Sequence, residues 1–230
     1  NLISQMDLAM TLTNQFGAQA LLSNSADANE NGSADMSPQD NDNLRDSERF
    51  SRKLTSLATE VAKRNGKNLN FSISGAQHLD ELGDVGTALY DIAVQLVRNS
   101  IVHGVEAPGE RNDQDKPDFG KLHISFERRS KTLAMIVSDD GRGLQFGEIR
   151  KKALALGLIN TDETEALDNK GLLKLLFKPG FSSIDDVSED AGRGVGLDSV
   201  KKTLEDVHGS ITVGTEPGKH TVFRINVPIS

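Results

Sequence analysis

The 230-residue sequence contains no cysteine. This absence excludes disulfide bonds, zinc sites built on thiolates and catalysis by a thiol nucleophile. It also fits a reducing compartment, so we expect a cytoplasmic protein. Long hydrophobic runs are missing as well, since no stretch approaches the ~20 apolar residues that cross a bilayer. Residues 1–10 lack the basic start and continuous apolar stretch of a signal peptide, and we predict no direct membrane insertion.

An excess of basic residues is also lacking. Lys and Arg number 26 against 34 Asp and Glu, which gives a formal net charge of -8. Such a surface repels phosphate backbones, so we expect no binding to nucleic acid. An acidic chain that binds a nucleoside triphosphate needs a metal ion or a few well-placed basic groups to offset the phosphate charge. Mg²⁺ is therefore expected if the ligand is a triphosphate.

The N-terminal stretch differs in composition from the rest. Apolar residues at helical spacing over residues 2–22 predict an amphipathic helix. Residues 23–43 are rich in Ser, Asn, Asp, Gly and Pro and have almost no large apolar side chain. Such a segment cannot bury enough surface to offset its ordering entropy, which favours a flexible linker. We therefore divide the chain into this helix and linker, residues 1–46, and one domain, residues 47–230.

The second part mixes helical and strand periodicities, which predicts an α/β (α+β) domain. Helices are expected at residues 47–65, 83–102, 146–156, 170–177 and 195–207. Strands are expected at residues 68–74, 121–127, 132–138, 210–213 and 221–227.

A polar stripe runs along the predicted helix at residues 83–102 and just beyond it. Asp91, Gln95, Asn99 and His103 are spaced by four, so they share one helix face, although their neighbours are strongly apolar. A buried polar group without a partner costs ~1–3 kcal/mol. The stripe therefore indicates a binding site, and the alternative is an ordinary surface helix with a solvent-facing stripe.

Three glycine-containing turns complete the pattern. Asp139 ends an apolar strand and is followed by Gly141 and Gly143, which lets the backbone approach a flat ligand; the alternative is a plain Asp-Gly turn. Three alternating glycines at residues 192–196 open the predicted helix at 195–207. Their backbone N–H groups suit phosphate, although flexible loops also collect glycine. The last turn, residues 217–223, leads into the final strand and could equally be a simple hairpin.

The order of these four segments resembles the N box, the two glycine boxes and the threonine box of the GHKL ATPase superfamily. That superfamily includes DNA gyrase, the chaperone Hsp90, the mismatch-repair protein MutL and the histidine kinases. Residues 96–106, 177–182 and 192–198, which read LVRNSIVHGVE, FKPGFS and GRGVGLD, are similar to those of the chemotaxis-type histidine kinases, CheA. The likeness covers about residues 50–230. It implies a two-layer sandwich, with a mixed β-sheet covered on one face by helices.

The resemblance also implies a site for ATP and Mg²⁺. Asn99 would ligate Mg²⁺ through its amide oxygen, and Asp139 would accept from the adenine amino group. Gly141 and Gly143 would let the base lie against the backbone, while Thr221 would support the pocket near Asp139.

Further residues are implied around the phosphates and above them. The phosphates would lie against Gly192, Gly194 and Gly196. Phe177 and Phe181 would belong to a lid between the two glycine boxes. Two basic residues, His103 and Lys152, are similar to groups near the phosphates in the resembled family.

Gln95 departs from the chemotaxis kinases, which usually have histidine at this position. In the hydrolysing relatives the position is a glutamate that acts as general base on water, and glutamine has no useful basicity. The residue therefore favours phosphoryl transfer over hydrolysis. Two alternatives are a catalytically inactive module that regulates a partner, and a hydrolysing clamp of the gyrase type.

A second departure from the family is His220, which lies in a turn where many relatives have glycine.

The resemblance places the acceptor outside this chain. None of the five histidines, His78, His103, His123, His208 and His220, lies in a helical-hairpin context like that of a phosphoacceptor. The expected partners are a histidine phosphotransfer domain, a response regulator receiver domain and a coupling protein. The family's dimerisation hairpin has two long helices, whereas the helices here are short. Residues 2–22 are then either a remnant of that hairpin or a tail.

Overall fold

A computed structural model describes residues 44–80, 82–160, 163, 166–181 and 196–229 of the chain. The chain divides after Arg45, and the fold described below belongs to the unit Asp46–Ser230. The helix expected at residues 2–22 and the linker expected at residues 23–43 lie outside the described residues. None of the helices that the structure describes is long and apolar enough to cross a bilayer.

Five strands form one mixed sheet in the order β1-β2-β3-β5-β4. The first pair, β1 and β2, is parallel, and the other three pairs are antiparallel. All five strands were predicted from the sequence; β1 begins one residue later than expected, and the other four extend their expected ranges by one to three residues. Their bounds are β1 Leu69–Ser74, β2 Gly120–Arg129, β3 Thr132–Asp139, β4 Ser210–Glu216 and β5 His220–Pro228.

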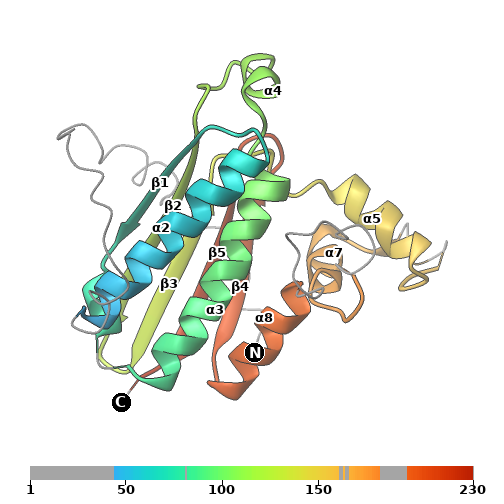
Figure 1. Cartoon of the computed structure of the whole chain (residues 1–230). Coiled ribbons are helices and arrows are strands. Elements are labelled where there is room, and N and C mark those ends of the chain that lie inside the picture. The colour runs from blue at the N-terminus through green and yellow to red at the C-terminus, as the bar shows by residue number, and fades with distance from the viewer. Residues whose placement is uncertain (1–43, 81, 161–162, 164–165, 182–195, 230) are drawn as a thin grey trace. The chain divides into compact units, whose positions relative to one another are not determined.

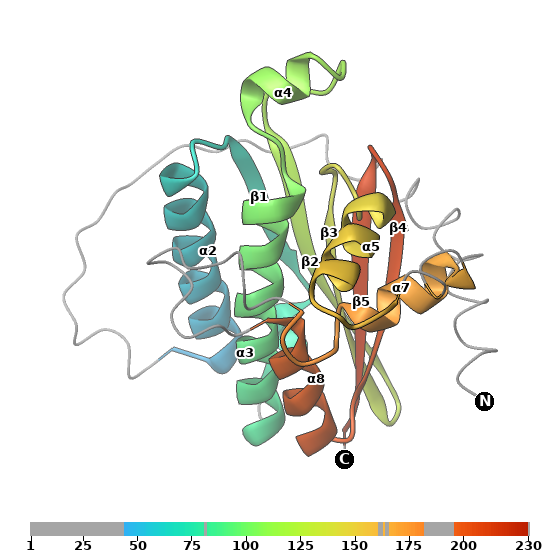
Figure 2. The ribbon, with the colours of Figure 1, turned by 90° about the vertical axis from the view of Figure 1, so that its right-hand side faces the viewer.

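Three helices cover one face of this sheet: α2 (Asp46–Arg64), α3 (Asp84–Asn99) and α8 (Leu197–Asp206). Figures 1 and 2 show them side by side in a layer of their own. Each helix is amphipathic and turns its apolar stripe inward, as Phe50, Leu54, Ala58 and Val61 do on α2. The arrangement confirms the expected two-layer sandwich.

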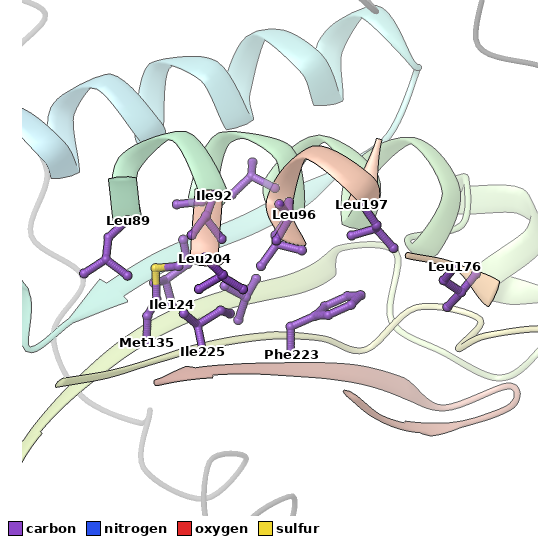
Figure 3. Packing of buried hydrophobic residues seen from close by; sticks show 14 of the residues in the cluster. Leu89, Ile92, Leu96, Ile124, Met135, Leu176, Leu197, Leu204, Phe223 and Ile225 are labelled. Carbon is purple, nitrogen blue, oxygen red and sulfur yellow. The ribbon is translucent and has the colours of Figure 1, made fainter. Parts of the chain in front are cut away.

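The core fills the space between the helix layer and the sheet. Leu89, Ile92 and Leu96 of α3 descend onto strand residues such as Ile124 and Phe223 (Figure 3). Alternate residues of β2, β3 and β5 are buried, because successive side chains of a strand point to opposite faces. The opposite face carries polar groups, including an ion pair at 2.9 Å between Arg224 and Glu127.

The remaining elements are short. Of these, α5 and α7 fall where the sequence predicted helices, whereas η2 and α4 were not predicted. Four or five residues give too little periodicity to recognise, and Pro108 and Gly109 of α4 are also typical of turns. The bounds are η2 Ala76–Leu79, α4 Pro108–Asn112, α5 Phe146–Ala155 and α7 Asn169–Leu175.

The end of α3 differs from the prediction. The α-helix was expected to run to residue 102, but it ends at Asn99 and continues as a π-helical turn, η3 (Ser100–Gly104). The Val105 N–H bonds to the Ser100 carbonyl, five residues back, at 2.7 Å. Lys67 stabilises the turn, because its Nζ donates to the carbonyls of Ile101 and Val102 at 2.6 Å each. π-Helical turns often mark functional sites.

Candidate functional site

The carboxylate of Asp139 lies at the end of β3, on the face that the helices cover. Asp139 is only 5% exposed, and the register of β3 and β5 sets buried Thr221 directly opposite it. Opposed residues of antiparallel strands point to the same face. The fold therefore brings Asp139 and Thr221, two residues singled out from the sequence, to one corner of the sheet.

Burial raises the pKa of Asp139 from its ordinary value of 3.8 to about 6. The nearby Ser100 hydroxyl and the Gly141 N–H favour the ionised form and offset part of this rise in pKa. The Gly141 N–H donates to Asp139 Oδ1 at 3.1 Å, whereas buried Ser100 Oγ has no well-formed hydrogen bond to a described residue. The carboxylate retains free acceptor capacity that a ligand amine could use.

The turn after Asp139 packs against the π-helical turn. A Cβ at Gly141 would overlap the Gly104 carbonyl, and a Cβ at Gly104 would lie 3.3 Å from Asp139 Oδ1. The Arg142 N–H also donates to the Gly104 carbonyl at 2.9 Å. Gly141 is therefore required by close backbone approach, and a side chain at Gly104 would crowd the Asp139 carboxylate.

The same turn is joined on its other side to the β4–β5 hairpin. Gly143 has a φ of +67°, and a Cβ there would overlap the Glu216 carbonyl. The Leu144 N–H donates to the Thr215 hydroxyl at 2.9 Å, and that hydroxyl donates to the His220 carbonyl at 2.9 Å. The loop from Asp139 to Leu144 is thus fixed between η3 and the hairpin. The side chain of His220, the second departure from the family, is half-buried beside it.

Gln95 and Asn99 lie one turn apart on α3, and both are half-buried. Gln95 lines a groove of about 220 Å³ between α3 and α8, together with Asp91, Ser199 and Thr203. Asn99 is the last residue of α3, immediately before η3. The polar stripe predicted from the sequence thus faces α8 at Asp91 and Gln95, and Asn99 directly precedes Ser100, the residue whose hydroxyl lies near Asp139.

His103 lies beyond α3, on the π-helical turn, and its side chain is exposed. Its four-residue spacing from Asn99 predicted a shared face of one α-helix. A π-helix has a wider turn than an α-helix, so that interpretation applies to Asp91, Gln95 and Asn99 within α3. It does not extend to His103.

Of the three glycines expected to hold phosphate, the structure describes Gly196. It is the residue before α8, it is buried, and its carbonyl accepts from the Ser199 hydroxyl at 2.7 Å. A phosphate expected here would meet the positive end of the α8 dipole. Gly192 and Gly194 lie outside the described residues.

Lys152 and Phe181 contact each other in a second group of predicted site residues, separate from those at the ends of β3 and β5. Lys152 of α5 places its Nζ 5.6 Å from the centre of the Phe181 ring. Phe181 follows α7 and is buried, whereas Phe177 is half-buried. The contact brings together Lys152 and Phe181, two residues predicted from the sequence, and Phe177 packs against the hydrophobic core.

Sequence reasoning missed three residues that build the Asp139 corner: Ser100, Gly104 and Thr215. Ser100 follows Asn99 directly and is a lone hydroxyl in an apolar stretch, which is a usable signal. Gly104 lies two residues beyond the end of the predicted helix, and nothing in the local sequence indicates its packing against Asp139. Thr215 gives no local signal, because only the hairpin geometry aims its hydroxyl at Leu144.

The corner fits a planar base that carries an amine. The buried Asp139 carboxylate supplies an acceptor, and the two glycines allow the backbone to approach closely. Among the described residues, no group of three or more His, Asp and Glu side chains is arranged to hold a metal ion. A metal held here by Asn99 would need most of its ligands from phosphate and water, as is usual for Mg²⁺.

Comparison with known proteins gives the family of the chain. Residues 84–230 match the family model of histidine kinase-, DNA gyrase B- and HSP90-like ATPases. The chemotaxis protein CheA of Bacillus subtilis is 38% identical over 188 residues, and the gliding motility regulatory protein of Myxococcus xanthus is 37% identical over 174 residues. The alignments cover 79% and 74% of this chain but only 26% and 22% of those proteins.

A solved structure also resembles the fold. The catalytic domain of the histidine kinase ThkA is 18% identical, with a TM-score of 0.45, over 79% of this chain and 90% of that domain. The chain spans about a quarter of the length of the curated relatives named above. The chain belongs to the family of histidine kinase-, DNA gyrase B- and HSP90-like ATPases and is a CheA-like catalytic domain of the histidine kinase type.

Proposed function

We propose that this domain binds Mg-ATP at the Asp139 corner and transfers the γ-phosphoryl group to a histidine on a separate phosphotransfer domain. The observation that carries the proposal is the buried Asp139 carboxylate, set opposite Thr221 and packed against Gly104. An adenine amino group would donate to this carboxylate. Guanine carries a carbonyl in place of that amine, so the corner would disfavour GTP.

The phosphates would extend from this corner towards Asn99 and the start of α8. Asn99 would hold Mg²⁺ through its amide oxygen, and the metal would offset the phosphate charge. The glycines before α8 would contribute backbone N–H groups. Lys152 and His103 are the proposed basic groups near the phosphates, and Phe177 and Phe181 would cover the nucleotide. Catalysis would then consist of positioning and charge stabilisation.

Gln95 and the residues around it favour phosphoryl transfer over ATP hydrolysis. Hydrolysis needs a base that accepts a proton from water, and Gln95 cannot act as one. Asp91 lies in the same groove but is eight residues before Asn99 on α3. At 1.5 Å per residue, the two positions are about 12 Å apart along the helix. Asp91 is therefore too far from a metal at Asn99 to activate a water beside it.

The proposed partners follow from the same chemistry. A phosphotransfer domain would present the histidine, a response regulator receiver domain would take the phosphoryl group onward, and a coupling protein would link the kinase to its input. These partners are proposed for a protein with the length of the curated relatives, of which this chain spans about a quarter.

A second candidate is a nucleotide-binding module without kinase activity, and Gln95 is the observation that favours it. Labelled ATP and Mg²⁺ should be mixed with this domain and a histidine phosphotransfer domain of the parent protein. The proposed function predicts label on the acceptor histidine and little free phosphate. Clear ATP binding without labelled acceptor would support the inactive module, and rapid phosphate release would support a hydrolysing clamp.

A further inference from the structure

A buried ion-pair cluster lies beside the Asp139 corner, in the segment that joins η3 to β2. Arg111 of α4 is fully buried, and Glu106 is 1% exposed. Lys116 and Asp140 complete the cluster, with side chains that are 15% and 24% exposed. The two positive and two negative charges balance, as buried charges require.

The guanidinium group of Arg111 donates hydrogen bonds to several groups in this cluster. Its Nη1 and Nη2 donate to the two carboxylate oxygens of Asp140 at 3.2 and 3.0 Å, in the bidentate geometry that arginine favours. Nη1 also donates to Glu106 at 3.1 Å, and Nε donates to the Pro117 carbonyl at 2.6 Å. Arg111 thereby ties the α4 segment to the residue directly after Asp139.

Lys116 holds the backbone of the same turn. Its Nζ donates to Glu106 at 2.7 Å and to the carbonyls of Asp140 and Gly141 at 3.1 and 3.0 Å. The Lys121 N–H donates to Asp140 Oδ1 at 2.7 Å, which anchors the carboxylate to β2. The turn that packs against Gly104 is therefore also fixed by charge-assisted bonds from Lys116 and to Asp140.

The cluster is connected to Asp139 through the adjacent residue Asp140 and through Gly141. The Asp139 carboxylate accepts from the Gly141 N–H, and Gly141 has no free space against Gly104. A shift of Asp140 therefore moves both the carboxylate and its donor. Binding groups need placement within a fraction of an ångström, and an error of about 1 Å can cost on the order of 100-fold in catalysis.

A purely structural role explains this composition poorly. Burying Arg111 and Glu106, with Lys116 and Asp140 partly removed from water, is costly, and well-packed apolar residues of similar size often stabilise a protein as well or better. We propose that Arg111, supported by Glu106 and Lys116, is a positioning residue that fixes the Asp139–Gly141 turn and so sets the selection of adenine over guanine. This inference rests on the proposed function of Asp139 as the adenine acceptor.

The test compares Arg111→Lys with the wild type in calorimetric binding of Mg²⁺ complexes of ATP, GTP and inorganic tripolyphosphate. Lysine keeps the charge and loses the bidentate fork. Loss of hydrogen bonds to charged groups predicts ATP binding weakened by about tenfold or more. Binding of GTP and tripolyphosphate should change little, so the ATP-to-GTP preference falls. Arg224→Lys, in the ion pair on the outer sheet face, is the matched control and should leave all three affinities unchanged.

The outcomes separate the possibilities. A folded Arg111→Lys protein with the wild-type ATP-to-GTP preference would overturn the inference, and so would equal weakening of all three ligands, which indicates general loosening. If Arg111→Lys does not fold, Lys116→Met serves in its place, and an unchanged preference in that variant also overturns the inference. A wild-type protein without a preference for ATP would instead contradict the proposed function itself.

Discussion

Asp139 is the residue on which the chemistry of the corner depends. Its carboxylate is removed from water and yet keeps acceptor capacity beyond the single bond from Gly141. Such a group destabilises the free protein when it is ionised, and a ligand amine can compensate for part of that cost. Burial raises the pKa of Asp139 to about 6, and this accords with the proposed role of the carboxylate as acceptor for a ligand amine.

The pH dependence of stability gives a prediction for Asp139. Because burial raises its pKa from 3.8 to about 6, the folded state holds this proton more tightly than the unfolded state. The free energy of unfolding therefore falls as the pH rises from about 4 to about 6. The penalty amounts to about 3 kcal/mol at pH 7.

Asp139→Asn should thus raise the free energy of unfolding, by up to about 3 kcal/mol at pH 7 and by much less at pH 4. Urea unfolding at both pH values measures this difference. Asp206→Asn, at an exposed position at the end of α8, is the control. An Asp139→Asn effect that is equal at the two pH values would contradict an ionised, buried carboxylate.

Asn99 gives a prediction about the metal. Removing the amide in Asn99→Ala should remove the dependence of ATP affinity on Mg²⁺, which we expect to be at least about tenfold in the wild type. Calorimetry with Mg²⁺ and with a chelator measures it. Asn226→Ala, on the outer face of β5, should retain the full Mg²⁺ dependence. If Asn99→Ala retains it too, the assignment of Asn99 as ligand is wrong.

At the scale of elements, the π-helical turn η3 connects α3 to the Asp139 corner. It places Gly104 against the carboxylate and leaves Ser100 buried beside it. Its carbonyls are held by Lys67, whose pKa burial lowers, with Arg142 as a second cause. The turn therefore depends on a residue from the segment before β1, far from it in sequence.

Lys67→Met should loosen η3. Two hydrogen bonds from a charged donor would be lost, and we expect the free energy of unfolding to fall by about 1.5–3 kcal/mol. ATP affinity should fall as well, because Gly104 and Ser100 lose their fixed positions. Chemical denaturation and calorimetry measure the two effects. Lys63→Met, at an exposed position on α2, should change neither, and an Lys67→Met protein that behaves like this control would contradict the role of Lys67.

At the scale of the whole molecule, the sequence predicted most of the architecture. Each strand and each long helix was recognisable because its buried face has a regular period of 2 or 3.6 residues, as in β2 and α3. The elements that were missed, η2 and α4, are too short for a period to appear. The π-helical turn was missed because the apolar pattern continues through it, and because the residue that bonds its carbonyls, Lys67, lies outside the local sequence.

The candidate site residues were identified in a different way. Asp139 and Asn99 were found through local patterns, and Thr221 was found through the family resemblance. The cluster of Arg111, Glu106, Lys116 and Asp140 was not, because its bonds span up to 29 residues and its charges look like ordinary surface charges in sequence. Burial alone distinguishes them.

The proposed adenine site is tested most directly by a comparison of ATP and GTP binding to the wild type and to Asp139→Asn, measured by calorimetry with Mg²⁺. We expect that the wild type prefers ATP, and that the variant loses about tenfold or more in ATP affinity while its GTP affinity changes little. A wild type that binds neither nucleotide, or a variant that keeps the full preference for ATP, would contradict the assignment of the Asp139 corner as the adenine site.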